Sequence, residues 1–147
     1  MNLKKIEIYG FKSFSDKLAM SFDYPVTGVV GPNGCGKSNV VDATRWVLGE
    51  QSAKALRGKT MQDLIFSGTE ERKSMSYCEV ALFMDNKNRI FPIEMDEVVI
   101  SRKLYRNNES EYFLNKNLVR LKDISDILRD AGLGREGYSI VGQGRMD

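Results

Sequence analysis

The chain has 147 residues, a formal net charge of +2 and no histidine, and 41% of its residues are hydrophobic. This length suits one domain that buries about two-thirds of the surface of its unfolded chain. The near-neutral charge leaves any nucleic-acid contact to local patches, and the lack of histidine excludes histidine acid–base chemistry and histidine metal sites. Two cysteines, Cys35 and Cys78, are too few for a disulfide framework and fit a reducing cytosol. No apolar run approaches the length of a transmembrane helix, about 18 residues, and no signal peptide is visible, so we expect a cytoplasmic protein without membrane contact.

Three short stretches near the start of the chain have the composition of β-strands: Leu3–Tyr9, Leu18–Phe22 and Val26–Val30. Over Ser38–Leu48 apolar residues recur on one broad helical face, which predicts a helix, and Gly49 is a typical helix stop. A polar loop, 50–60, then leads to a short helical turn at Met61–Ile65.

The second half alternates apolar segments with polar turns, which favours antiparallel strands. We expect strands at Tyr77–Met84, Arg89–Ile93, Val98–Tyr105 and Glu111–Leu114, with turns at 85–88, 106–110 and 115–117. Leu121–Ala131 has the spacing of an amphipathic helix that Gly132 closes, and Tyr138–Val141 is a short last strand. The pattern predicts a single α/β unit over 1–147, a core with a mixed sheet and an antiparallel β subdomain.

Residues 31–38 read Gly-Pro-Asn-Gly-Cys-Gly-Lys-Ser, a complete G-x-x-x-x-G-K-S phosphate-binding loop. The loop lies between an expected strand and an expected helix, so backbone N–H groups and the positive helix end would face a bound phosphate. Lys37 would reach the β- and γ-phosphates as a point charge, and the Ser38 hydroxyl would ligate Mg²⁺.

Four further features leave alternatives open. Asp85 follows an apolar strand, as a magnesium-binding aspartate does, but it also opens an Asp-Asn-Lys-Asn turn that is a sufficient local reason for it. Arg57 either reaches a phosphate or DNA from a glycine-hinged loop or is a solvated surface residue. Gln143, between two glycines, either orients a water or metal or simply forms a turn. The G-x-G-x-x-G pattern at 132–137 follows a helix rather than a strand, which argues against a dinucleotide site.

Several blocks carry a more specific resemblance: Lys4–Phe14 with its Gly-Phe-Lys-Ser-Phe element, Val30–Ser52 around the phosphate loop, Leu56–Gly58 and Tyr138–Gly144. Through these blocks the chain resembles the N-terminal head segment of bacterial SMC proteins, the chromosome-organising ATPase family. The resemblance extends over nearly the whole chain. Arg145-Met146-Asp147 resembles the start of the coiled-coil arm. Related ATPases of recombination and break repair match the 46–58 and 138–144 blocks less well. One departure is Cys35, where serine is usual.

The resemblance implies an ABC-type ATPase head that binds ATP and Mg²⁺. It implies catalytic roles for Lys37, for Gln143, which would bind Mg²⁺ and the attacking water, and for Arg57, which would act near the γ-phosphate and couple hydrolysis to DNA. Ser38 would be the other magnesium ligand. The implied nucleotide contacts are Lys12, Ser13, Gly31, Pro32, Asn33, Gly34, Cys35, Gly36, Lys37, Ser38 and Asn39.

The resemblance also implies partners. Heads of this family are completed by a C-terminal half that supplies the Walker B aspartate, the catalytic glutamate and the Ser-Gly-Gly signature, and this sequence contains none of them. We therefore expect the chain to need that half, a second SMC protomer, a kleisin-type subunit with its accessory protein, and double-stranded DNA at the nucleoid. Alone, it should be inactive as an ATPase. The alternatives are a small self-sufficient kinase-like enzyme that uses Asp85, a related DNA-repair ABC ATPase, and a non-catalytic interaction module that binds no ATP.

Overall fold

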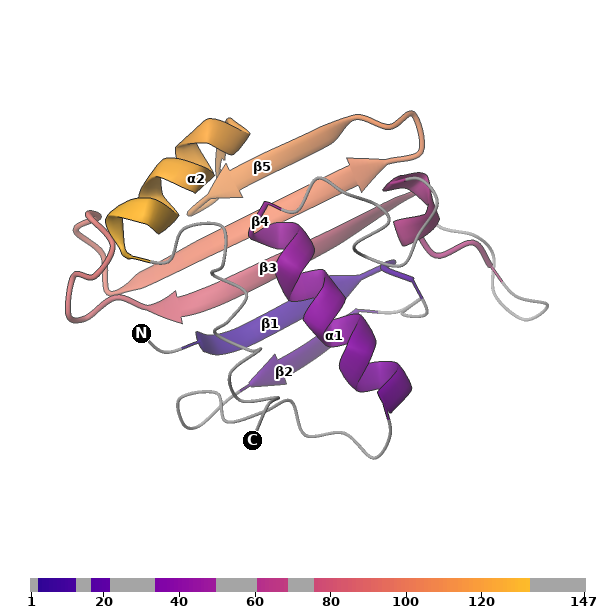
Figure 1. Cartoon of the computed structure of the whole chain (residues 1–147), viewed down its shortest axis with the longest axis horizontal. Coiled ribbons are helices and arrows are strands. Elements are labelled where there is room, and N and C mark those ends of the chain that lie inside the picture. Colours follow the sequence, from indigo (N-terminus) through magenta and orange to yellow (C-terminus); the bar gives the residue numbers. More distant parts are fainter. Residues whose placement is uncertain (1–2, 13–16, 22–33, 50–60, 69–75, 133–147) are drawn as a thin grey trace.

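The computed structural model of the chain describes residues 3–12, 17–21, 34–49, 61–68 and 76–132, with the backbone alone for 34–39 and 62–63 (Figure 1). Its strands form one antiparallel sheet in the order β2-β1-β3-β4-β5-β6. The strands are β1 (Leu3–Tyr9), β2 (Leu18–Ser21), β3 (Tyr77–Asp85), β4 (Glu97–Tyr105), β5 (Ser110–Leu114) and β6 (Asn117–Val119). The helices are α1 (Gly34–Val47), the 3₁₀ helix η2 (Met61–Leu64) and α2 (Leu121–Asp130).

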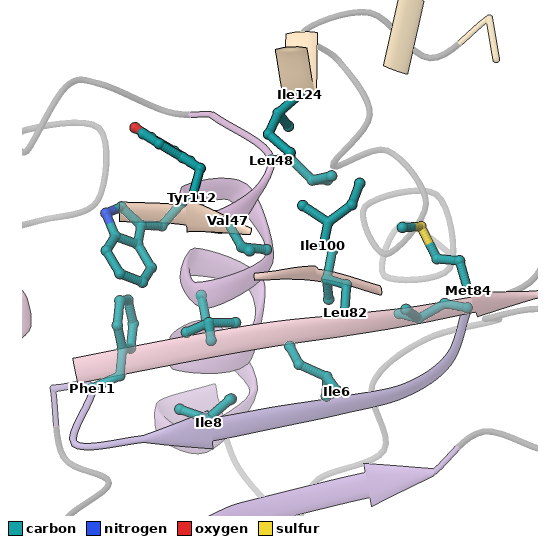
Figure 2. Packing of buried hydrophobic residues seen from close by; sticks show 14 of the residues in the cluster. Ile6, Ile8, Phe11, Val47, Leu48, Leu82, Met84, Ile100, Tyr112 and Ile124 are labelled. Atoms are coloured by element: carbon teal, nitrogen blue, oxygen red, sulfur yellow. The ribbon is translucent and has the colours of Figure 1, made fainter. Parts of the chain in front are cut away.

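One face of the sheet is apolar because alternate residues of a strand point to the same side. Ile6, Leu82 and Ile100 lie opposite one another across β1, β3 and β4, and none of them is exposed. Both α-helices pack on this face and join its side chains in one hydrophobic cluster. Figure 2 shows Leu82 and Ile100 beside Val47 of α1, and Ile124 of α2 next to Leu48. The core therefore lies between the sheet and its two helices.

Helix α1 crosses the sheet obliquely, from a start near β2 to an end close to α2 (Figure 1). The ring of Phe11, which follows β1, packs on the indole of Trp46 with centroids 5.6 Å apart. Gly49 ends the helix with a φ of +117°, and a Cβ at this position would lie 3.5 Å from Cδ1 of Leu121. The end of α1 thus lies against the start of α2.

The connection between β3 and β4 is organised by one side chain. Asn86 is 1% exposed and donates hydrogen bonds to the carbonyls of Phe91, Ile93 and Met95, at 3.3, 2.9 and 2.9 Å. Its Oδ1 accepts a hydrogen bond from the N–H of Phe91 at 2.9 Å. The return strand expected at Arg89–Ile93 is therefore wrong: Asn86 bonds the backbone groups that a strand would pair, and the chain returns as β4.

The other described elements agree with expectation apart from their ends. β1, β3, β4, β5, α2 and η2 are confirmed, and β2 runs to Ser21. α1 begins at Gly34, four residues before the expected Ser38. β6 is a strand that the sequence did not predict. The strands expected at Val26–Val30 and Tyr138–Val141 lie outside the described residues, so the expected mixed part of the sheet is not tested.

The Asn86 hydrogen bonds give a first prediction. Asn86→Ala should lower the free energy of unfolding by about 2–3 kcal/mol, because it leaves several backbone groups of a packed loop without partners. Asn88→Ala, at an exposed position of the same turn, should change it by less than about 0.5 kcal/mol. Urea denaturation of the purified chain measures both values. Equal stability of the two variants would contradict the role given to Asn86.

Candidate phosphate-binding site

Helix α1 begins inside the phosphate-loop motif. Its first residue is Gly34, so the N–H groups of residues 34–36, which have no acceptor within the helix, belong to the motif. Its first turn contains no acidic residue that would offset the positive end of the helix. This end of α1 therefore has the backbone arrangement that binds a phosphate. Gly31, Pro32 and Asn33 lie outside the described residues.

Lys12 is brought to α1 by a short bridge between two segments. The Lys12 N–H donates to the carbonyl of Leu64 at 2.6 Å, and the Phe66 N–H donates to the carbonyl of Gly10 at 2.7 Å. From this fixed backbone, with a φ of +53°, Lys12 extends its Nζ to within 2.8 Å of Oδ2 of Asp42 in α1. The two side chains are only 15% and 6% exposed. This largely buried ion pair joins the segment after β1 to the middle of α1.

Arg102 holds the opposite end of α1. It lies on the inner face of β4, is 2% exposed, and donates from an Nη to the carbonyl of Trp46 at 2.9 Å. Its guanidinium carbon lies 4.7 Å from the centroid of the Trp46 ring and 4.8 Å from that of Tyr112. A cation between two aromatic faces, bonded to a carbonyl of the last helical turn, is favoured by the rings and by the helix dipole.

The structure describes only some of the expected site residues. It places residues 34–39 at the start of α1 and Lys12 beside the same helix. Ser13, Arg57 and Gln143 lie outside the described residues, so their roles stay predictions. In the described part of the chain, no group of three or more His, Cys, Asp and Glu residues could hold a metal ion. Nor is any helix there long and apolar enough to cross a membrane.

Asp85, the alternative magnesium ligand, lies away from this site. It ends β3, whereas Glu79, six residues earlier, pairs with Tyr9 at the end of β1 that leads to Lys12. Six residues of strand span about 20 Å.

A cavity lined by Tyr9, Tyr77 and Glu79, among others, is also separate from the candidate phosphate site, because it opens on the sheet face that the helices leave uncovered.

Sequence reasoning missed two residues that position α1, Asp42 and Arg102. Asp42 had a visible signal, since it is a charged residue within the apolar run Val40–Thr44. Arg102 had a weaker one: it alternates with Ile100 and Leu104, so its register places a charge on the apolar face.

Comparison with known proteins identifies the family. The sequence profile of the "RecF/RecN/SMC N terminal domain" family matches residues 2–140. The chain belongs to this family. It is 54% identical over its whole length to the chromosome partition protein Smc of Clostridium kluyveri and 50% identical to that of Bacillus subtilis. In each case it spans 12% of the relative's length.

Solved structures place the chain within a head. It matches the Smc head of Pyrococcus furiosus bound to the C-terminal domain of ScpA, with 43% identity and a TM-score of 0.87 over 93% of this chain and 35% of that one. A structure from work on ATP-driven dimerization and DNA-stimulated activation of SMC ATPases matches with 41% identity and a TM-score of 0.88, over 99% of this chain and 89% of that one. RecF, at 22% identity and a TM-score of 0.61, shares the fold. The chain thus has the fold of the N-terminal lobe of an SMC head, an ABC-type P-loop NTPase with an antiparallel sheet.

The Arg102 contacts give a second prediction. Arg102→Met should lower the free energy of unfolding by about 2–3 kcal/mol, because a charge-assisted hydrogen bond and two ring contacts are lost. Arg102→Lys should restore little of this, since an ammonium lacks the planar face that stacks between two rings. Arg129→Met is the control: Arg129 pairs with Asp126 on the surface, and its loss should cost less than about 0.5 kcal/mol. Full stability of Arg102→Lys in urea denaturation would contradict the stacking role.

Cys78 gives a third prediction. Burial raises the pKa of its thiol to about 12, and the positive charge of Arg102 opposes this rise only in part. A free thiol has a pKa of about 8.5, so the folded state should hold roughly a thousandfold less Cys78 thiolate at neutral pH.

In Cys35→Ser, which leaves Cys78 as the only thiol, maleimide labelling at pH 7 should therefore be far slower in buffer than in urea. The raised pKa also means that Cys78 stabilises the fold fully below about pH 8.5 and progressively less as the pH rises toward 12. Equal labelling rates with and without urea would show that Cys78 is accessible in the folded protein.

Proposed function

We propose that this chain is the ATP-binding N-terminal lobe of the head of an SMC chromosome partition ATPase, acting in the cytoplasm on double-stranded DNA. One observation carries the proposal. A helix begins within a complete phosphate-loop motif, at Gly34, in a lobe that matches an SMC ATPase structure at a TM-score of 0.88 over 99% of the chain.

The roles of the site residues follow from charge and position. The backbone of residues 31–39 would surround the phosphates, with Lys37 as the main side-chain charge on the β- and γ-phosphates. Ser38 and Gln143 offer oxygen ligands, which Mg²⁺ prefers, and Gln143 would also orient the attacking water. Arg57 would act near the γ-phosphate and couple hydrolysis to DNA. When bound, the magnesium ion would neutralise charge on the phosphates.

The partners are proposed from the relatives. The Pyrococcus furiosus head is bound to ScpA, and the SMC ATPases of another study dimerise when driven by ATP and are activated by DNA. We extend this to a C-terminal half of the same head, a second SMC protomer, and a kleisin-type subunit with its accessory protein. Alone, this lobe should hydrolyse ATP at no more than the background rate.

Two other functions are less well supported. A self-sufficient enzyme that uses Asp85 is disfavoured, because this residue lies about 20 Å along the sheet from the end of β1 that leads to the site. A module that keeps the motif without binding ATP would give no signal in a nucleotide titration.

Lys37→Ala tests the proposal. In the assembled head, it should weaken binding of a fluorescent ATP analogue roughly ten- to a hundredfold, because a hydrogen bond to a charged group contributes about 1.5–3 kcal/mol. Lys87→Ala, at an exposed position after β3, is the matched control and should bind as the wild type does. Unchanged affinity of the Lys37→Ala head would refute the proposal.

A further inference from the structure

We propose that Asp42 is a positioning residue for ATP, which holds the Lys12 ammonium against α1 so that it faces the phosphates. The inference rests on the proposed function. It adds a residue to which neither the phosphate-loop motif nor the family resemblance assigns a role.

The geometry places Asp42 on the phosphate side of α1. It follows Ser38 by four residues, so the two positions share one face of the helix. Helical side chains lean toward the N-terminus of their helix, which displaces the Asp42 carboxylate toward the phosphate loop. Lys12 Nζ, 2.8 Å from Oδ2 of Asp42, is therefore held on the Ser38 face, within about 8 Å of Lys37 along the helix axis.

The backbone of Lys12 is fixed independently of this pair. Hydrogen bonds of Lys12 and Gly10 to the segment 64–66 hold it on one side, and the ring of Phe11 packs on Trp46 on the other. The long, flexible side chain is what remains to be ordered, and a lysine carries about 2 kcal/mol of rotamer entropy. The hydrogen bond to Asp42 orders it before any ligand arrives.

Stability alone is a weak reason for this arrangement. A largely buried ion pair recovers little more than the cost of removing two charges from water, and apolar residues of similar volume are often as stable. An ammonium carries three N–H donors, however, so one that is bonded to Asp42 can also donate to a phosphate oxygen. Asp42 thus fixes the direction of a cation.

A double-mutant cycle tests the inference. In the assembled head, Asp42→Asn and Lys12→Met should each weaken binding of the fluorescent ATP analogue about tenfold, the value of one charged hydrogen bond. The double variant should also lose about tenfold rather than a hundredfold, because Asp42 acts through Lys12. Glu97→Gln is the matched control. It breaks the Lys4–Glu97 pair, which has a similar N–O distance of 2.9 Å but lies exposed between β1 and β4, and it should leave affinity unchanged.

A charge exchange separates positioning from structure. Lys12→Asp combined with Asp42→Lys restores an ion pair, so it should recover the urea stability lost in the single variants. It also moves the cation to the helix and puts a carboxylate on the Lys12 backbone, so ATP affinity should stay at least about tenfold low. If the pair had a purely structural role, the charge exchange would recover both the stability in urea and the affinity for ATP.

The outcomes separate the two proposals. Unchanged or tighter ATP binding by Asp42→Asn, multiplicative losses in the double variant, or full recovery of affinity by the exchange would overturn the role of Asp42. If the Lys37→Ala head also binds normally, the proposed function itself fails. If Lys37→Ala loses affinity while Asp42→Asn does not, only the further inference fails.

Discussion

The position of α1 on the sheet depends on the buried guanidinium of Arg102. A charged group that is 2% exposed is costly unless its donors and its charge are satisfied. The last turn of α1 meets part of this demand, since the Trp46 carbonyl accepts a hydrogen bond from Arg102 at 2.9 Å and the indole lies against the guanidinium. Sliding or rotating α1 would leave the charge without these partners. The helix is therefore fixed at its C-terminal end, about 20 Å from its first turn, which lies within the phosphate-loop motif.

Trp46 connects Arg102 to the segment after β1 that carries Lys12. Its indole contacts Arg102 from β4 and also packs on Phe11, the residue before Lys12. Lys12 then returns to α1 through Asp42, four residues before Trp46. Trp46, Phe11, Lys12 and Asp42 thus close a ring of contacts between α1 and the segment after β1, and Arg102 joins this ring to β4. A displacement of any one of them would move the Lys12 ammonium relative to the first turn of α1, which is the geometry on which phosphate binding would depend.

Local patterns predicted most of the described elements because their information lies within each segment. Alternation in β3, for example, correctly separates Cys78, Val80, Leu82 and Met84 from their exposed neighbours. The order of strands could not be predicted in this way, since the residues of β1 pair with residues of β3 that lie 70 to 81 positions later, and no local signal specifies that partner. The strand predicted after Asn86 was wrong for another reason. Its residues favour a strand, but the buried side-chain amide of Asn86 forms hydrogen bonds with their backbone groups.

The residues of the candidate site were likewise predicted only in part. The phosphate loop is a contiguous motif, so the sequence alone indicated residues 31–38 as a phosphate-binding loop, and the resemblance added Lys12. Asp42 and Arg102 matter through contacts with residues thirty and fifty-six positions away, which no spacing rule encodes. Their shared signal is a charged residue at an apolar position. This signal indicates that the charge has a partner in the fold, but it does not identify the partner residue.

The charges near α1 also explain why hydrolysis would need more than this lobe. The acidic residue of α1 is Asp42, and its carboxylate already accepts a hydrogen bond from the Lys12 ammonium at 2.8 Å. Asp85 is about 20 Å away along the sheet. What the described residues would offer a nucleotide is positive charge: the partial charge of the N–H groups in the first turn of α1 and the ammonium group of Lys12. Such groups bind phosphate and stabilise negative charge as it develops, but they accept no proton. In the function proposed above, the proton acceptor comes from the C-terminal half of the head, so we expect binding to precede assembly of the head and hydrolysis to depend on it.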